Sequence, residues 1–126
     1  MPTTLPASLM SALIEESLDS VLIVDEHCRI CYANQSLASL SGHPTQELLG
    51  QSLDVLLPSA MAAYHTDYVR IFAQDEQPSA VLGKVREFSI THKDGRIIPI
   101  EMKALDLGEH EGVRYFGAFL EDLRPR

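Results

Sequence analysis

One histidine of this chain stands in the middle of an apolar helical stripe. Met61, His65, Tyr68, Val69 and Phe72 recur at helical spacing and share one face of a predicted helix. An imidazole buried in that stripe needs a partner for its polar nitrogen atoms. A haem iron is one such partner, because neutral imidazole is a common proximal ligand of haem. The alternative is a histidine at the edge of the core, hydrogen-bonded to the backbone or exposed to solvent.

The second candidate for binding chemistry is Arg86, which alternates with Phe88 and Ile90 along a predicted strand. An arginine in an apolar register is unexpected unless it meets an anion or a polar ligand. Two simpler interpretations are open. Arg86 can form a surface salt bridge with a neighbouring glutamate such as Glu101. Lys84 shares the same alternation, so this side of the strand can also be exposed.

Cys28 and Cys31 form a C-x-x-C pair, a spacing that occurs in redox and metal sites. No second pair of ligands accompanies it in the sequence. The pair lies in a predicted strand, where residues three apart point to opposite faces. We therefore expect two ordinary thiols.

The composition is that of one folded domain. The chain has 126 residues, of which 45% are apolar and 22% are charged, so the composition does not indicate disorder. A net charge of −8 disfavours nonspecific nucleic-acid binding, which needs a basic surface. The sequence has no apolar run long enough for a membrane helix and no secretory signal. We therefore expect a cytoplasmic protein that binds neither nucleic acid nor membrane.

The sequence contains no recognisable catalytic set. It has no Ser/His/Asp or Cys/His arrangement, no phosphate-binding loop and no zinc motif. We therefore expect a binding module and not an enzyme.

The pattern of apolar residues predicts an antiparallel sheet with short helices. An N-terminal helix carries Leu9, Leu13 and Ile14 on one side, and Asn34 caps a short helix that Gly42 ends. The order of elements indicates an α+β fold, with a five-stranded antiparallel sheet and helices on one face. The predicted helices cover residues 6–18, 35–41, 45–49 and 58–73, with 53–57 leading into the last of them; the strands cover 20–25, 28–33, 80–92, 97–107 and 113–123; turns or loops cover 26–27, 74–79, 93–96 and 108–112.

This arrangement leaves an apolar cleft between the longest helix and the last strands. Ile98, Ile100, Met102 and Ala104 alternate along one strand and share one face, which would form a wall of that cleft. Such a cleft is the default binding site of a small α+β domain.

The order of elements and the residues that mark it resemble the PAS family. The matching pieces are VLIVDEHCRICYAN, LSGHPTQELLGQSLDVLLP, REFSITHKDGRIIPIEM and YFGAFLEDL, which together span about residues 13–123. The resemblance implies a sensor domain whose helices and sheet enclose a pocket and whose flanking helices pass on the signal. It implies an N-terminal cap helix region at 1–18, the sensor domain at 19–123 and a C-terminal tail at 124–126.

Two motifs are similar to those of oxygen-sensing haem PAS domains from bacterial histidine kinases and cyclic-nucleotide phosphodiesterases. His65, Tyr68 and Val69 match H-x-x-Y-[IV], and residues 83–87 match G-x-x-R-E. Lys84 departs from the apolar residue that is usual at its position. The resemblance implies bound haem b with His65 on the iron, Arg86 contacting oxygen or another diatomic gas, Arg70 near a propionate, and an apolar wall of Val81, Ile100, Met102 and Ala104.

Two alternatives from the same family are open. One is a noncovalently bound flavin or small metabolite in the pocket, because the cysteines lie too far upstream for light-driven flavin chemistry. The other is a ligand-free dimerisation module. In either case the N-terminal helix, with Leu9, Leu13 and Ile14, is expected to form a homodimer. The output would come from a domain or partner protein that is not in this chain.

Overall fold

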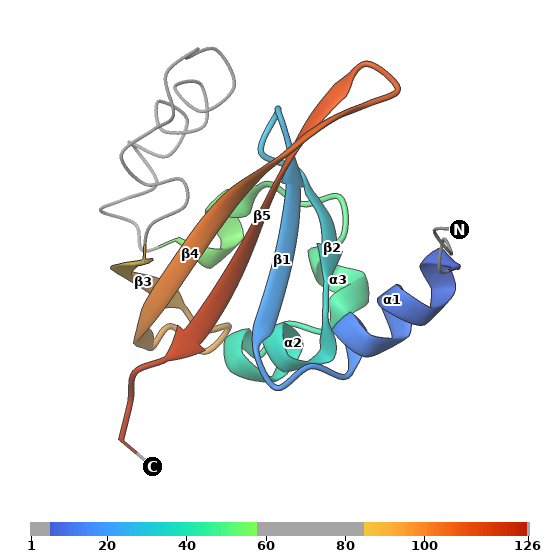
Figure 1. Ribbon diagram of the computed structural model, residues 1–126. Coiled ribbons are helices and arrows are strands. Elements are labelled where there is room, and N and C mark those ends of the chain that lie inside the picture. Colours follow the sequence, from blue (N-terminus) through green and yellow to red (C-terminus); the bar gives the residue numbers. More distant parts are fainter. Residues whose placement is uncertain (1–5, 58–84, 126) are drawn as a thin grey trace.

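Five antiparallel strands form one curved sheet in which strands far apart in the sequence are neighbours (Figure 1). The structure is a computed structural model that describes residues 6–57 and 85–125. The strand order is β2-β1-β5-β4-β3, so the first and last strands pair in the middle of the sheet. The strands are β1 (Ser20–Asp25), β2 (Ile30–Ala33), β3 (Val85–Thr91), β4 (Ile97–His110) and β5 (Val113–Asp122).

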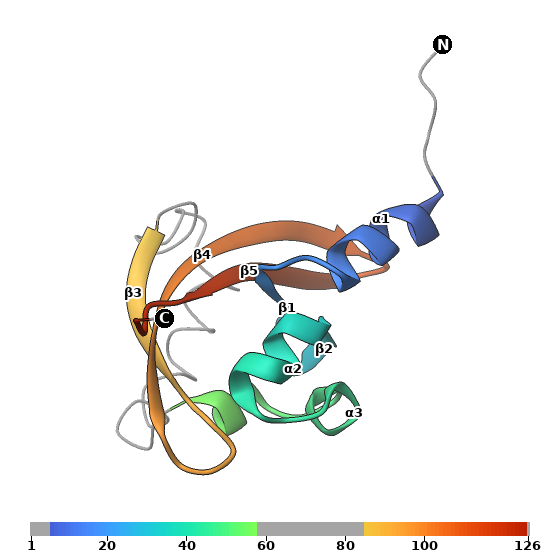
Figure 2. The ribbon, with the colours of Figure 1, turned by 90° about the horizontal axis from the view of Figure 1, so that it is seen from below.

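Short helices lie on the concave side of this sheet. They are α2 (Gln35–Ser41), α3 (Thr45–Leu48) and the 3-10 helix η1 (Leu53–Leu56). The N-terminal helix α1 (Ala7–Glu15) extends away from this layer (Figure 2). The α+β architecture, with a five-stranded antiparallel sheet and helices on one face, is therefore confirmed.

The core lies between the concave side of the sheet and the short helices. Leu37, Leu48 and Leu56 are fully buried, and they meet Ile98 and Ile100 of β4 in one apolar cluster. Each such side chain contributes about 1.5–3 kcal/mol through its removal from water. The short helices are held mainly by this packing, because helices of four to seven residues are not stable alone.

Asn34 joins three separate parts of the chain. Its side-chain oxygen caps α2 by accepting from the N–H of Leu37 and also accepts from the N–H of Val21. Its side-chain nitrogen donates to the carbonyl oxygens of Ile14 and Asp19, both at 2.9 Å. The residue is completely buried, and all four hydrogen-bonding positions of its amide are used.

The other end of α2 is fixed by the turn between β3 and β4. Gly42 ends the helix in the left-handed conformation, at φ 77°, and a Cβ there would clash with the imidazole of His92. The N–H of Lys93 donates to the carbonyl of Ser41 at 2.8 Å, and the Lys93 ammonium pairs with Glu47. Glycine is required both for the backbone angle and for the close approach of the histidine ring.

Most predicted element boundaries are confirmed, and three were wrong. The helix predicted at 6–18 ends at Glu15, because the carbonyl of Ile14 accepts from the N–H of Ser17 and from the Asn34 amide in place of a further helical turn. The predicted strand at 28–33 begins only at Ile30, because Cys28 has φ 65° and the Asp25 carboxylate accepts from the N–H groups of His27 and Arg29 in a turn. The predicted loop at 108–112 is mostly strand. Pairing shifts register at Gly108 and continues to His110, so the glycine marks a bulge and not the end of β4.

The predicted helix at 58–73, the loop at 74–79 and the first part of the strand predicted at 80–92 lie outside the described residues.

Replacing Asn34 should strongly destabilise the domain. Asn34→Ala removes four buried hydrogen bonds, and we expect a loss of about 3 kcal/mol in the free energy of unfolding. Asn34→Asp should be no milder, because it sets a carboxylate against the two carbonyl oxygens of Ile14 and Asp19. Urea denaturation measures both.

Gln35→Ala is the matched control, because Gln35 is exposed and its N–H stays in place. It should change the unfolding free energy by less than about 0.5 kcal/mol. Equal losses in the Asn34 and Gln35 variants would contradict the role given to Asn34.

Candidate functional site

The concave face of β4 carries a continuous apolar wall. Ile98, Ile100 and Ala104 are buried, and Met102 packs partly buried against the same cluster. The structure confirms that these four residues share one face, as their alternation predicted. The face forms because successive side chains of a strand point to opposite sides.

Strand β3 extends this wall sideways. Ile90 pairs with Ile98 and Phe88 pairs with Ile100, so their side chains stand next to one another on the concave side. The backbone of Arg86 is opposite Met102, one step further in the same register. The alternative that this side of β3 is exposed to solvent is therefore wrong at Phe88 and Ile90, which contact the core.

Strand β5 and the short 3-10 helix add residues that the sequence analysis did not single out. Ala118 of β5, together with Leu53 and Val55 of η1, packs against the core without being fully buried. The alternation of Phe116, Ala118 and Leu120 was the available signal for β5. Apolar surface on the concave side is thus left partly accessible at Leu53, Val55, Phe88, Met102 and Ala118.

The remaining predicted site residues are not among the residues described. His65, Tyr68, Val69, Arg70 and Val81 lie outside the described ranges, as does the side chain of Arg86. Their proposed roles stay predictions. The structure therefore brings together Ile100, Met102 and Ala104 as one wall.

The two cysteines of the C-x-x-C pair lie in different surroundings. Cys28 is buried and Cys31 is exposed, and both are free thiols. The prediction that the two thiols point to different sides is confirmed. The reason given for it, strand alternation, was wrong, because Cys28 lies in the left-handed turn before β2 and not in the strand. Within the described ranges, no three His, Cys, Asp or Glu side chains converge closely enough to hold a metal ion.

Burial controls the chemistry of Cys28. Desolvation, with smaller contributions from Asp54 and Asp25, raises the pKa of this thiol to about 12. The pKa of Cys31 is also raised, mainly by desolvation. Neither residue has the electropositive surroundings that activate a nucleophilic cysteine.

The curved five-stranded sheet, its short covering helices and its apolar concave wall are the features of a PAS fold. The chain belongs to the PAS family, since the family model described as the PAS fold matches residues 8–123. PAS domains are sensor modules of signalling proteins.

The relatives of the chain are much longer proteins. It is 28% identical over 110 residues to a probable serine/threonine-protein kinase of Dictyostelium discoideum, covering 86% of this chain and 7% of the kinase. It is 26% identical over 109 residues to the oxygen sensor protein DosP of Escherichia coli, and the match covers 86% of this chain and 13% of DosP. It is 26% identical over 107 residues to the sensor protein FixL of Bradyrhizobium diazoefficiens, and the match covers 83% of this chain and 20% of FixL.

Solved structures show the same fold. The PAS domain of an HTR-like protein from Haloarcula marismortui superimposes with a TM-score of 0.70 at 24% identity, covering 93% of this chain and 91% of that one. An RNA-binding Light-Oxygen-Voltage receptor superimposes with a TM-score of 0.75 at 16% identity, covering 98% of this chain and 35% of the receptor. None of the described helices is both long and apolar enough to cross a membrane.

The two cysteines should differ sharply in reactivity. At pH 8 we expect iodoacetamide to alkylate Cys31 at least about tenfold faster than Cys28, because Cys28 is buried and its thiol is almost entirely protonated. Peptide mass spectrometry after timed quenching measures both rates. The difference should disappear in denaturing urea. Similar rates in the folded protein, or a Cys28–Cys31 disulfide, would contradict this assignment.

Proposed function

We propose that residues 19–123 form a PAS sensor domain that binds haem b on the concave side of the sheet and senses oxygen or another diatomic gas. The observation that carries the proposal is the apolar wall of β3, β4 and β5, whose residues Phe88, Met102 and Ala118 remain partly accessible. Such a surface suits a flat apolar cofactor. Residues 1–18 would form the cap helix region and 124–126 the tail.

The described residues fit an apolar cofactor. Ile100, Met102 and Ala104 would exclude water from one side of the bound group, because no polar atom interrupts their side chains. His65 would hold the iron through an imidazole nitrogen. Haem would supply an iron atom that binds a diatomic gas.

Other residues would supply polar contacts and complete the wall. Arg86, at the end of the apolar row of β3, would donate a hydrogen bond to the gas, as its register opposite Met102 allows. Arg70 would lie near a propionate, and Tyr68, Val69 and Val81 would complete the surroundings. Two of the relatives named above, an oxygen sensor and a sensor protein, support a sensory role at 26% identity.

The signal would be a shift between two populations of the domain. Only an interaction that differs between the gas-bound and gas-free states can move that equilibrium. The contact of Arg86 is such an interaction, and its loss would release β3. A flavin or small metabolite against the same wall is the alternative ligand, and mass spectrometry of compounds that co-purify would identify it.

Haem binding is tested by adding hemin to the purified protein. We expect a saturable Soret band that shifts on reduction with dithionite and again on addition of carbon monoxide. His65→Ala should remove or weaken this band, because it deletes the iron ligand. Arg86→Ala should keep the band but lower the oxygen affinity about 10-fold or more, because a charge-assisted hydrogen bond is lost.

His110→Ala is the matched control, since His110 lies exposed near the β4–β5 turn. Its spectra should equal those of the unchanged protein. A wild-type protein without a saturable Soret band would overturn the haem proposal and leave the flavin, the metabolite or the ligand-free module.

A specific observation favours dimerisation as a second function of the same domain. Helix α1 buries none of its residues, and Leu9, Met10 and Leu13 are 57%, 55% and 76% exposed. At about 100° per residue, these three lie on one side of the helix and Ser11 and Glu15 on the other.

The polar side of α1 is the one that holds it to the domain. The Glu15 carboxylate accepts from the N–H of Gln35 at 2.8 Å, and the hydroxyl of Ser36 donates to the carbonyl of Ser17. The apolar side therefore faces outward, where a second α1 can cover it.

Charges on that side should abolish the dimer. We expect Leu9→Glu/Leu13→Glu to be monomeric but still folded, because both side chains are largely exposed in the monomer. Ser8→Glu/Ser11→Glu adds the same charge to the polar side and should remain dimeric. Size-exclusion chromatography with light scattering distinguishes them. A monomeric wild type, or two variants that behave alike, would contradict dimerisation through α1.

A further inference from the structure

The imidazole of His92 lies where two parts of the domain meet. His92 follows β3 and opens the turn at residues 92–96, and its ring rests against Gly42 at the end of α2. The side chain is only 18% exposed. Because α2 lies on the concave side, the ring continues the row that Phe88 and Ile90 form along β3.

Two groups of Asp94 compete for one ring nitrogen of His92. Nδ1 lies 3.1 Å from the backbone nitrogen of Asp94, which donates to it, and 3.1 Å from the carboxylate oxygen Oδ1 of the same residue. An unprotonated Nδ1 accepts from the N–H but repels the carboxylate. A protonated Nδ1 donates to the carboxylate but can no longer accept. The two contacts therefore suit two different protonation states of the ring.

The carboxylates of this cluster stay ionised where histidine titrates. The pKa of Asp94 is lowered, first by the hydrogen bond from the N–H of Arg96. The pKa of Glu47 is lowered, first by the hydrogen bond from the ammonium of Lys93. Histidine is the side chain whose charge ordinarily changes between pH 5 and 8. Acidification in that range therefore changes the charge of the imidazoles and not of the carboxylates.

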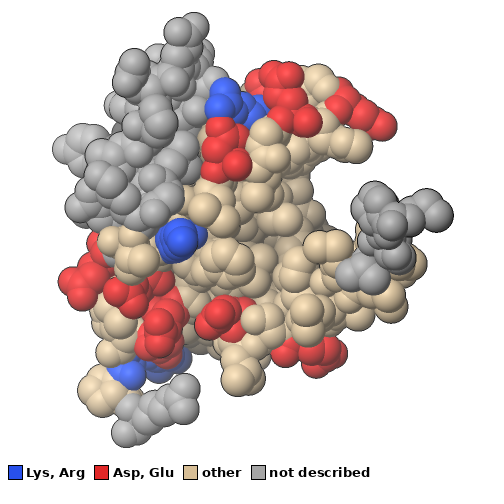
Figure 3. Space-filling model, in the orientation of Figure 1, with Lys and Arg blue, Asp and Glu red and all other residues tan. Residues whose placement is uncertain are grey.

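The fixed charges around the ring balance one another. Each cation is paired with a carboxylate: Lys93 with Glu47, Arg96 with Asp94 and Arg124 with Asp122. Arg124 also faces Asp94, and His43 lies 3.9 Å from Glu47. Figure 3 shows acidic and basic side chains side by side near the C-terminal end of the chain. A proton on His92 therefore adds a positive charge to a neutral cluster, with the Asp94 carboxylate directly beside it.

The end of α2 also favours a positive ring. The last carbonyl groups of a helix carry partial negative charge, which favours a cation nearby. Helix α2 itself contributes no ionisable side chain. Gly42 has no side chain to keep the ring away, and the carbonyl of Ser41 accepts from the N–H of Lys93 in the same turn. Both Asp94 and α2 thus stabilise a protonated His92.

We propose that His92 is a proton-dependent switch in the β3–β4 turn. In the alkaline form, Nδ1 carries no proton and accepts from the N–H of Asp94. In the acid form, a proton from solvent is bound to Nδ1, which donates to Oδ1 of Asp94, and the N–H of Asp94 turns to water. Acidification thereby changes the hydrogen bonding and the charge at the contact between α2 and the turn. The proposal does not depend on haem or on any other ligand.

The proton on each ring nitrogen is read from long-range proton–nitrogen correlation spectra of isotope-labelled protein between about pH 8 and about pH 5. We expect the alkaline form of His92 to carry its proton on Nε2 and the acid form to carry protons on both nitrogens. A coupling across the hydrogen bond, from the backbone nitrogen of Asp94 to Nδ1, should be present only in the alkaline form. A proton on Nδ1 in the alkaline form, a coupling that persists in the acid form, or no proton uptake in this range would each overturn the proposal.

Asp94→Asn tests the partner of the acid form. It removes the charge but keeps an oxygen that can accept from the N–H of Arg96. The pH midpoint of His92 protonation should fall by about 0.5 units or more, because the imidazolium loses its carboxylate. The amide signals of Gly42 and residue 94 should follow the ring midpoint in both proteins. An unchanged midpoint would contradict the exchange between the two groups of Asp94.

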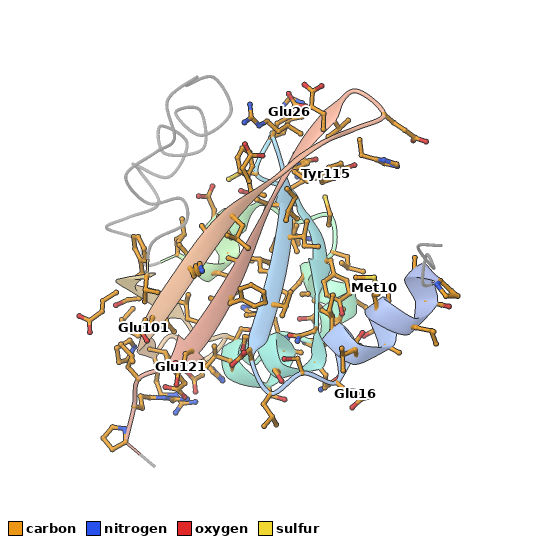
Figure 4. The ribbon with its side chains drawn as sticks, viewed as in Figure 1. Met10, Glu16, Glu26, Glu101, Tyr115 and Glu121 are labelled. Atoms are coloured by element: carbon orange, nitrogen blue, oxygen red, sulfur yellow. The ribbon has the colours of Figure 1, made fainter. Side chains whose placement is uncertain are left out.

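His27→Gln is the matched control, because His27 is exposed in the β1–β2 turn. Figure 4 labels its neighbour Glu26 at one end of the sheet and Glu121 at the other, which is the end where the β3–β4 turn lies. This variant should leave the pH dependence of the Asp94 and Gly42 amide signals unchanged.

His92→Gln should abolish the pH dependence of both amide signals, whereas His43→Gln should keep it. A pH dependence that survives in His92→Gln, or is lost in His43→Gln, would assign the titration to another group and refute the switch.

Discussion

The amide of Asn34 is the interaction on which the arrangement of this domain depends. Its four hydrogen bonds tie the end of α1, the start of β1 and the first turn of α2 to one buried point. No apolar residue could replace it, because four backbone groups would lose their partners inside the protein. The core defines how the sheet and helices pack, and Asn34 defines where the N-terminal helix leaves them.

Helix α2 consequently connects two regions with different proposed roles. Its first turn holds α1 through Asn34 and Gln35. Its last turn is bonded to the β3–β4 turn through Ser41 and Lys93. A movement of β3 is thus connected to α1 through seven residues of helix, without passing through the centre of the sheet.

Local rules account for most of what the sequence predicted. Asn34 and Gly42 fixed both ends of α2 because a cap and a left-handed glycine act within a few residues. Gly108 was misjudged because a bulge and a turn use the same residue type, and only pairing with β5 distinguishes them. The wall of Ile100, Met102 and Ala104 followed from alternation. The pairing of Glu101 with Glu87 and with Glu121 could not be predicted, because it depends on the exact register of the β3–β4 and β4–β5 hairpins, and the bulge at Gly108 shifts the second register.

The pairing of β1 with β5 has a mechanical consequence. Ser20, where the chain enters the sheet, is paired with Leu120, close to where it leaves. Tension applied to the two flanking segments would therefore load the pairs between β1 and β5 one after another, starting at this end, and not all at once. The pairs between β1 and β5 should therefore separate sequentially under a small force. A pull from neighbouring parts of an assembly would then be enough to separate the two central strands.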